Sequence, residues 1–321
     1  AIGQWFREKG IDKITVSSVD MAKYFSNEGW NDILIAFPLN LNEIEEINSL
    51  ARRLEHLHLT LENKEGFKFL ENHLQHPAGI YLKIDAGYGR TGIKWTNFNT
   101  INELITAINK SKKLKLTGLL VHSGHTYHAN STGEILRIHN ESIDRLQSIK
   151  AQLDHNQELI ISIGDTPGCT LADNFEGVDE IRPGNFVFYD LQQYKAGACN
   201  LPDIAVCLAC PVVAKHEERS ELIIYGGAVH FSKEFLMEGD QPIYGYGVKM
   251  SDKDWMPYTS RMILTKVSQE HGIVSVTPEV FREINIGEFI GFLPVHSCLT
   301  ANLMRQYKDL AGNHYDHLSG S

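Results

Sequence analysis

The residues best suited to chemistry follow two apolar runs in the middle of the chain. Residues 162–170 read Ser-Ile-Gly-Asp-Thr-Pro-Gly-Cys-Thr, and residues 180–190 read Glu-Ile-Arg-Pro-Gly-Asn-Phe-Val-Phe-Tyr-Asp. Backbone N–H groups and hydroxyls can converge in turns of this composition, which makes such turns good cradles for anions. With Arg182 between them, the two turns would suit a small phosphorylated cofactor. Two ordinary strand-to-loop turns are the alternative interpretation.

Two earlier stretches also place polar groups after apolar runs. Residues 83–92 read Lys-Ile-Asp-Ala-Gly-Tyr-Gly-Arg-Thr-Gly, and residues 122–128 read His-Ser-Gly-His-Thr-Tyr-His. In the first, Arg90 could bind an anionic oxygen of a ligand, whereas an arginine in a flexible surface loop is the alternative. In the second, His122 or Tyr127 could flank an aromatic cofactor ring. A metal site on the three histidines is the alternative there.

A third kind of chemistry is indicated near the end of the chain, where residues 294–298 read Pro-Val-His-Ser-Cys. His296 and Cys298 are two positions apart, so in an extended segment both side chains project to the same side. One imidazole and one thiolate on the same side form half of a zinc site. The alternative is a buried cysteine beside a structural histidine.

The elements that must position these residues alternate between strands and helices up to about residue 190. Apolar, β-branched runs predict strands at 14–16, 33–36, 56–60, 80–84, 114–121, 159–163 and 178–181, and helical periodicity predicts helices at 21–28, 41–53, 64–73, 100–110 and 133–152. This alternation predicts a parallel sheet, with functional residues at the carboxyl ends of the strands.

A (β/α)8 barrel needs eight strands, and the pattern supplies seven. Because the chain opens on residues that read as a helix, we expect the first strand to lie upstream of Ala1, and the chain to be a fragment of a longer polypeptide. An open, doubly wound sheet is the alternative, although no Gly-x-Gly-x-x-Gly turn supports a dinucleotide fold.

The alternation of predicted strands and helices ends after Leu191. Strand-like runs at 204–215, 221–228, 262–268, 273–276 and 289–293 are separated by short polar turns, and a helix is predicted at 300–310. We therefore predict two domains, a cofactor-binding barrel at residues 1–195 and a mainly antiparallel β domain at residues 196–321.

Composition excludes some classes of function. The formal net charge of −10 argues against nucleic acid or an anionic membrane surface as the main partner. No apolar run is long enough to suggest a membrane span, and the start shows no signal-peptide pattern. The five scattered cysteines fit free thiols in a reducing compartment, which predicts a cytoplasmic location.

Taken in order, these five motifs resemble the fold-type III pyridoxal phosphate (PLP) enzymes related to alanine racemase, within them the D-serine dehydratase and D-threonine aldolase family. The resemblance rests on residues 83–92, 122–127, 162–167, 180–190 and 296–298 and runs over nearly the whole chain. It implies a barrel that holds PLP, followed by a β domain, in a head-to-tail homodimer.

The resemblance also implies roles for individual residues. The phosphate would be held by Gly164, Thr166, Gly184 and Asn185. Arg90 would contact the ring oxygen, and Tyr127 would lie near the pyridine nitrogen, with Arg182 as the alternative partner. His122 and Tyr189 complete the cofactor-binding set, and His122 and Arg90 are also the candidate catalytic residues. His296 and Cys298 would bind a divalent metal, zinc by preference, or else manganese or magnesium.

One departure concerns the Schiff-base lysine, which in this family follows the first barrel strand. No lysine of the given sequence stands in that place, so we expect it upstream of Ala1, and Lys83 reads as structural. A protein that truly began at Ala1 would bind PLP at most weakly and would not catalyse.

The implied activity is that of a PLP- and metal-dependent lyase acting on 3-hydroxy D-amino acids, most simply D-serine. Retro-aldol cleavage of D-threonine is an alternative, although such aldolases resemble a His-Asp rather than a His-Cys metal pair. A racemase is the other alternative. It would need a second base, for which Tyr244 or Tyr246 could serve.

Overall fold

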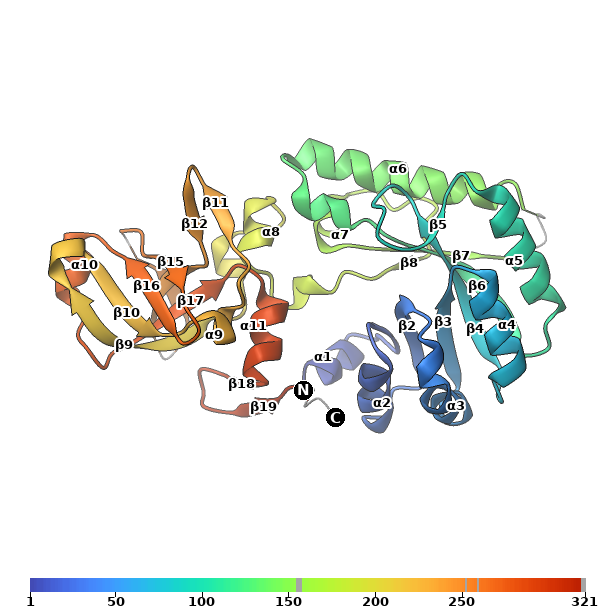
Figure 1. Cartoon of the computed structure of the whole chain (residues 1–321), viewed down its shortest axis with the longest axis horizontal. Coiled ribbons are helices and arrows are strands. Elements are labelled where there is room, and N and C mark those ends of the chain that lie inside the picture. Colours follow the sequence, from blue (N-terminus) through green and yellow to red (C-terminus); the bar gives the residue numbers. More distant parts are fainter. Residues whose placement is uncertain (154–157, 252, 259, 319–321) are drawn as a thin grey trace. The chain divides into compact units, whose positions relative to one another are not determined.

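The computed structural model describes residues 1–153, 158–251, 253–258 and 260–318. The chain divides into two compact units, one formed by residues 1–184 and the other beginning at residue 185 (Figure 1). Among the described residues, no helix combines the length and the apolar character needed to cross a membrane.

The first unit is built on one curled parallel sheet. Along the sheet the strands run in sequence order: β1 (Lys13–Val16), β2 (Asp32–Pro38), β3 (His56–Leu61), β4 (Ala78–Asp85), β6 (Leu114–His122), β7 (Ile160–Gly164) and β8 (Glu180–Ile181), while β5 (Ile93–Lys94) pairs with the end of β4. All seven predicted strands are present and neighbouring strands are parallel, which confirms the TIM-like class.

Helices connect these strands and lie on the outside of the curve, as α4, α5 and α6 show in Figure 1. They are α1 (Ile2–Glu8), α2 (Val19–Asn27), α3 (Ile44–Arg53) after the 3₁₀ turn η1 (Leu41–Glu43), α4 (Lys64–His73), α5 (Phe98–Lys110), α6 (Thr132–Lys150) after η2 (Gly124–His128), and α7 (Thr166–Leu171). Local capping fixes where several of them begin. The Ser18 hydroxyl, for example, accepts the Met21 N–H at 3.1 Å.

Alternation along the strands separates two faces of the sheet. On β4, Ile80 and Leu82 belong to the large core under the helices, whereas Tyr81 is buried in a small cluster on the other face. On that inner face, the Lys13 ammonium of β1 meets the Glu180 carboxylate of β8 at 2.5 Å. These two strands are the ends of the sheet order in the described chain. The predicted additional strand upstream stays a prediction.

The second unit is a closed antiparallel β-barrel, which confirms the predicted β domain. Its strands are β9 (Leu208–His216), β10 (Glu221–Tyr225), β13 (Gly245–Met250), β14 (Trp255–Pro257), β15 (Ile263–Val267), β16 (His271–Ser275) and β17 (Phe289–Pro294), with two hairpins, β11 (Leu236–Glu238) with β12 (Gln241–Ile243) and β18 (Gln306–Lys308) with β19 (His314–Asp316). The order β13-β15-β16-β10-β9-β17 closes because β17 also pairs with β13.

Short helices and turns fill the connections of this unit. They are η3 (Asn185–Val187), α8 (Leu191–Lys195), η4 (Leu201–Asp203), η5 (Glu217–Arg219), α9 (Ala228–Phe231), α10 (Pro278–Glu283) and α11 (Ser297–Met304). The helix predicted at 300–310 was misplaced. It begins directly after His296 and ends where Arg305 adopts a left-handed conformation with φ of 56°, after which the chain forms β18. The domain boundary predicted near residue 195 stays a prediction.

Candidate active site

Four predicted residues of the first unit stand at the carboxyl ends of parallel strands. Arg90 follows β4, His122 ends β6, Gly164 ends β7 and Arg182 follows β8. Because these ends lie on one edge of a parallel sheet, the residues are expected to be neighbours. They are close enough that the charges of Arg90 and Arg182 both act on the titration of His122.

The loop after β4 is folded around one carboxylate. The Asp85 Oδ1 atom accepts hydrogen bonds from the N–H groups of Gly87 and Gly89, both at 2.9 Å. Both glycines have positive φ, 120° and 76°, which side chains rarely tolerate. The loop thus presents Arg90, whose guanidinium carbon lies 5.1 Å from the centre of the Tyr88 ring. This cation–π contact orients an otherwise exposed arginine.

Aromatic rings surround His122. Its ring centre lies 6.2 Å from that of Tyr88 and 6.3 Å from that of Tyr127. Burial, and after it the charges of Arg90 and Arg182, lower the pKa of His122 to about 4, so the imidazole is neutral at physiological pH. A neutral, flat ring suits contact with an aromatic ligand. Tyr88 was not predicted, although it lies within the Gly-Tyr-Gly-Arg motif.

Arg182 is fixed on the inner face of the curled sheet, with a side chain that is only 7% exposed. Its Nε donates to the Ser162 hydroxyl at 2.7 Å, and its Nη2 donates to the Val121 carbonyl at 2.6 Å. The Ser162 hydroxyl donates in turn to Glu180 at 2.5 Å, and Glu180 is paired with Lys13. The guanidinium therefore belongs to a polar network on the inner face of the sheet.

A third cation adds to the positive charge at this edge. Lys83 of β4 is 5% exposed, and its Nζ donates to the Ala36 carbonyl at 3.4 Å. Burial lowers the pKa of Lys83 to about 8; the charges of Arg90 and Arg182 act in the same direction, and the Glu62 carboxylate partly opposes them. Crowded cations of this kind are relieved by an anionic ligand, so the donor set fits a phosphorylated cofactor.

The two glycines of the predicted phosphate cradle in this unit have different surroundings, and their phosphate-binding roles stay predictions. A Cβ atom on Gly164 would lie 3.0 Å from atoms of Arg182, so a side chain here would fit only if Arg182 moved by a few tenths of an ångström. A Cβ atom on Gly184 would meet nothing within 4 Å, so its backbone borders open space. Between them, the N–H of the buried Thr166 donates to the Tyr127 hydroxyl at 3.2 Å.

Asp165, next to the cradle, leads to a prediction about stability. The carboxylate is 3% exposed, and its Oδ1 accepts from the Thr126 hydroxyl at 2.8 Å and the Gly168 N–H at 2.6 Å. Burial outweighs these bonds and raises its pKa from 3.8 to about 6. The folded state therefore holds this proton more tightly than the unfolded state. The contribution of this carboxyl group to the free energy of unfolding is fully present below pH 4 and is lost as the pH rises through 6.

Asp165→Asn keeps the acceptor oxygen without the ionisation. We expect this variant to raise the free energy of unfolding by about 1–3 kcal/mol at pH 8, with a gain that shrinks as the pH falls toward 4. Urea unfolding of the cofactor-free protein across this pH range measures the difference. A gain that is constant with pH, or a loss at pH 8, would contradict it.

In the second unit, Asn185 and Tyr189 lie on the segment that begins this unit. The Asn185 amide nitrogen donates to the Asp190 carboxylate at 2.6 Å and to the Cys298 sulfur at 3.6 Å. Tyr189 has a φ of 51° and packs partly buried beside Leu191 and Leu293. The phosphate-binding roles of Asn185 and Tyr189 stay predictions. The side chain of Asn185 connects this segment with the predicted metal pair.

His296 directly precedes α11 and Cys298 lies in its first turn, so the segment is not extended over both residues as predicted, and their role as a metal pair stays a prediction. Nδ1 of His296 lies 2.7 Å from the Glu234 carboxylate, and the Cys298 sulfur accepts the Asn185 amide at 3.6 Å. Burial lowers the pKa of His296, but the partners Cys298 and Glu234 together raise it to about 9. Nitrogen and sulfur donors side by side are the combination that zinc prefers. Within the described parts of the chain, no group of three His, Cys, Asp or Glu residues is placed to hold a metal.

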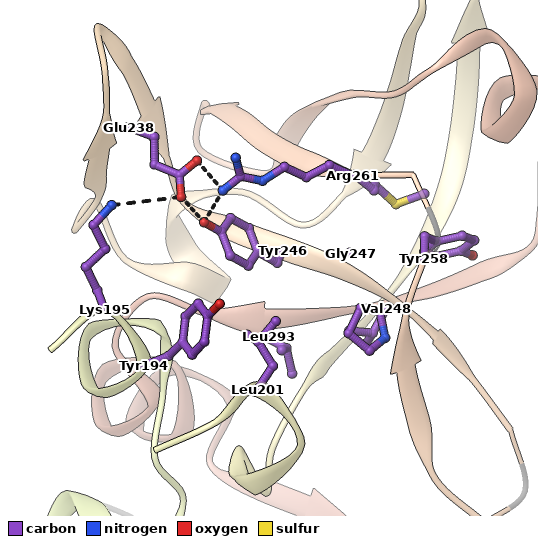
Figure 2. Close-up of a pocket in the computed structure, with 12 residues that line it drawn as sticks. Tyr194, Lys195, Leu201, Glu238, Tyr246, Gly247, Val248, Tyr258, Arg261 and Leu293 are labelled. Carbon is purple, nitrogen blue, oxygen red and sulfur yellow. Dashed lines mark hydrogen bonds and ion pairs between the residues drawn. The ribbon is translucent and has the colours of Figure 1, made fainter. Parts of the chain in front are cut away.

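A cavity of about 530 Å³ in the second unit contains Tyr246, one of the two candidate racemase bases (Figure 2). The Tyr246 hydroxyl donates to Glu238, and Arg261 contacts both residues. Burial and the Glu238 carboxylate raise the pKa of Tyr246 to about 12. A phenol held protonated in this way is a poor general base. The other candidate, Tyr244, packs against Phe235 with ring centres 5.8 Å apart.

Comparison with known families agrees with both units. Residues 2–192 match the family model described as alanine racemase, N-terminal domain, and residues 205–308 match the model described as putative serine dehydratase domain. The first match spans more than half of the chain, so the chain belongs to the alanine racemase N-terminal domain family.

Two curated proteins are similar to this chain over most of its length. The chain is 29% identical to D-serine dehydratase of Dictyostelium discoideum over 95% of this chain and 81% of that protein. It is 24% identical to D-threo-3-hydroxyaspartate dehydratase of Delftia sp. strain HT23, over 96% of this chain and 83% of that protein.

Solved structures share the fold. The Delftia enzyme superimposes with a TM-score of 0.88 over 100% of this chain and 87% of that chain, at 21% identity. A cysteine-to-alanine mutant of the same enzyme, described as being in the metal-free form, gives 0.87 over 98% and 86% at 21% identity. D-threonine aldolase of Filomicrobium marinum gives 0.78 over 94% and 79% at 18% identity.

Proposed function

We propose that this chain forms a PLP- and metal-dependent lyase that acts on 3-hydroxy D-amino acids and converts D-serine to pyruvate and ammonia. The observation that carries the proposal is that His296 and Cys298 supply one nitrogen and one sulfur donor at the start of α11. The curated relatives named D-serine dehydratase and D-threo-3-hydroxyaspartate dehydratase support it. So does the description of a cysteine mutant of the Delftia enzyme as metal-free.

The chemistry divides between the cofactor and the metal. PLP supplies, when bound, an electron sink that makes the α-hydrogen of an amino acid acidic, and the metal supplies a Lewis acid for the departing β-hydroxyl. The protein's own task is to bind, orient and charge-balance these groups.

The barrel edge is suited to the cofactor. Arg90 and Arg182 bring positive charge and N–H donors to the anionic groups of the ligand, and Lys83 adds a cation behind them. The neutral imidazole of His122 provides a flat face for the pyridine ring. Lys83 was predicted to be structural, and its bond to the Ala36 carbonyl is compatible with that role.

The β domain is suited to the metal. In the proposal the Cys298 sulfur and the His296 Nε2 hold a divalent ion, and the donor types favour zinc over manganese or magnesium. The same donor types favour elimination over the aldolase alternative, for which the resemblance implied a His-Asp pair. The position of the Schiff-base lysine, the assignment of roles to domains 1–195 and 196–321, the cytoplasmic location and the homodimer remain part of the proposal.

The decisive test is pyruvate release by the full-length natural polypeptide loaded with PLP. We expect D-serine, or D-threo-3-hydroxyaspartate in a parallel assay for oxaloacetate, to be consumed with release of ammonia. A chelator should stop the reaction, and added Zn²⁺ should restore it. Turnover that survives complete metal removal would contradict the metal assignment. Glycine and acetaldehyde from D-threonine, without product from either 3-hydroxy acid, would favour the aldolase.

A further inference from the structure

A carboxylate far away in the sequence contacts the predicted metal pair. Glu234 lies in the segment between α9 and β11, and its Oε2 atom is 2.7 Å from Nδ1 of His296. The turn that presents it is specific. Ser232 has a φ of 75°, and its hydroxyl accepts the N–H of Glu234 at 3.1 Å. The backbone therefore directs this side chain toward the histidine.

The chemistry of this contact determines which nitrogen of the histidine is available. An ionised carboxylate can only accept a hydrogen bond, so Nδ1 of His296 must carry the proton. In the neutral form of the ring, which is the form that binds a metal, the lone pair is then on Nε2. Carboxylates that hold metal-binding histidines in one tautomer and one orientation act in this way.

The sulfur is oriented from a different side. The Asn185 amide donates to the Cys298 Sγ at 3.6 Å, and Asn185 is itself held by Asp190, which is 0% exposed. Asp190 also accepts the Ser297 N–H at 3.1 Å, at the start of α11. Both members of the pair are thus supported separately, the sulfur by a buried network and the imidazole by a carboxylate that is 45% exposed.

We propose that Glu234 is a positioning residue for the metal. It holds the His296 ring so that Nε2 and the Cys298 sulfur converge on one ion. This inference rests on the proposed function, since it assumes the metal site at His296 and Cys298. If Glu234 formed only an exposed ion pair, its removal would have little effect, because such pairs contribute about 0–1 kcal/mol.

Zinc affinity of the PLP-loaded enzyme tests the inference, measured by competition with a chromogenic chelator. We expect Glu234→Ala to weaken Zn²⁺ binding by about 10–100-fold. Glu234→Gln should lose less, because its amide oxygen still accepts the Nδ1–H. The matched control is Glu218→Ala, which removes an exposed carboxylate of the same unit, paired with Arg219 at 2.8 Å, and should bind zinc like the unmodified protein.

The results separate the inference from the function on which it rests. Cys298→Ala should lose zinc, and if Glu234→Ala then binds zinc like Glu218→Ala, the positioning role is wrong while the metal site stands. If Cys298→Ala binds zinc as tightly as the unmodified protein, both the site and the positioning role are wrong. PLP absorbance and the thermal midpoint of the metal-free variants show that folding is intact. A purely structural Glu234 would lower that midpoint without changing the zinc competition, in Glu234→Gln as well.

Discussion

Replacing Cys298 with alanine is expected to reduce turnover of D-serine by about a thousandfold or more while PLP stays bound. The variant removes one of the two proposed protein ligands, and a single imidazole would hold a divalent ion weakly. A Lewis acid at a departing hydroxyl contributes several kcal/mol, and about 4 kcal/mol corresponds to a factor of a thousand in rate. Three measurements on one preparation test this expectation. Steady-state pyruvate release gives turnover, metal content gives the bound ion, and PLP absorbance shows whether the cofactor stays bound.

Cys207→Ala is the matched control for this experiment. Cys207 is a partly buried thiol of the same unit, and burial raises its pKa to about 11, so it is not a ready metal ligand. We expect its replacement to leave metal content and turnover nearly unchanged. Cys298→Asp should retain part of the metal, because carboxylate oxygens also bind zinc. Full activity in Cys298→Ala, or equal losses in both alanine variants, would refute the assignment.

The parallel sheet could be predicted from the sequence because its strands are buried on both faces. Such strands appear as continuous apolar runs, as in residues 33–36, and all seven were found. The β domain was harder to predict. Strand β13 was not among the predicted runs, and it contains Gly245 and Gly247, a residue type that is depleted in strands. In the structure a Cβ atom on Gly247 would lie 2.3 Å from the Met262 sulfur, so glycine allows the strand to pass close to that side chain.

Some residues of the candidate site could also be predicted from the sequence, and others could not. Those at strand ends, such as Arg90 and His122, follow from the rule that barrel sites form at the carboxyl edge. Glu234 could not be found, because it meets His296 across 62 positions through a turn that has no periodic signal. Asn185 was found as a polar residue in a cradle. Its contact with Cys298, across 113 positions, depends on packing within the β domain and not on its local sequence.

Replacing Arg182 with leucine is expected to lower the free energy of unfolding by about 3–5 kcal/mol, because it leaves buried partners without their cation. The Glu180 carboxylate is 17% exposed, and it also pairs with Lys13, so part of its charge stays balanced. The Ser162 hydroxyl and the Val121 carbonyl lose a donor outright. Desolvation of these unpaired groups, more than the lost attraction itself, makes the change costly. Urea unfolding of the cofactor-free protein measures it.

Arg137→Leu is the control, since Arg137 on α6 forms an exposed pair with Glu141 at 2.6 Å and should contribute under about 1 kcal/mol. Adding Glu180→Gln to Arg182→Leu should recover only a small part of the loss, because it also leaves Lys13 without its carboxylate partner at 2.5 Å. A loss of less than about 1 kcal/mol in Arg182→Leu would contradict the buried network. Salt distinguishes the two sites further. Screening weakens the exposed pair at Arg137, whereas the effect of removing Arg182 should hardly change with ionic strength.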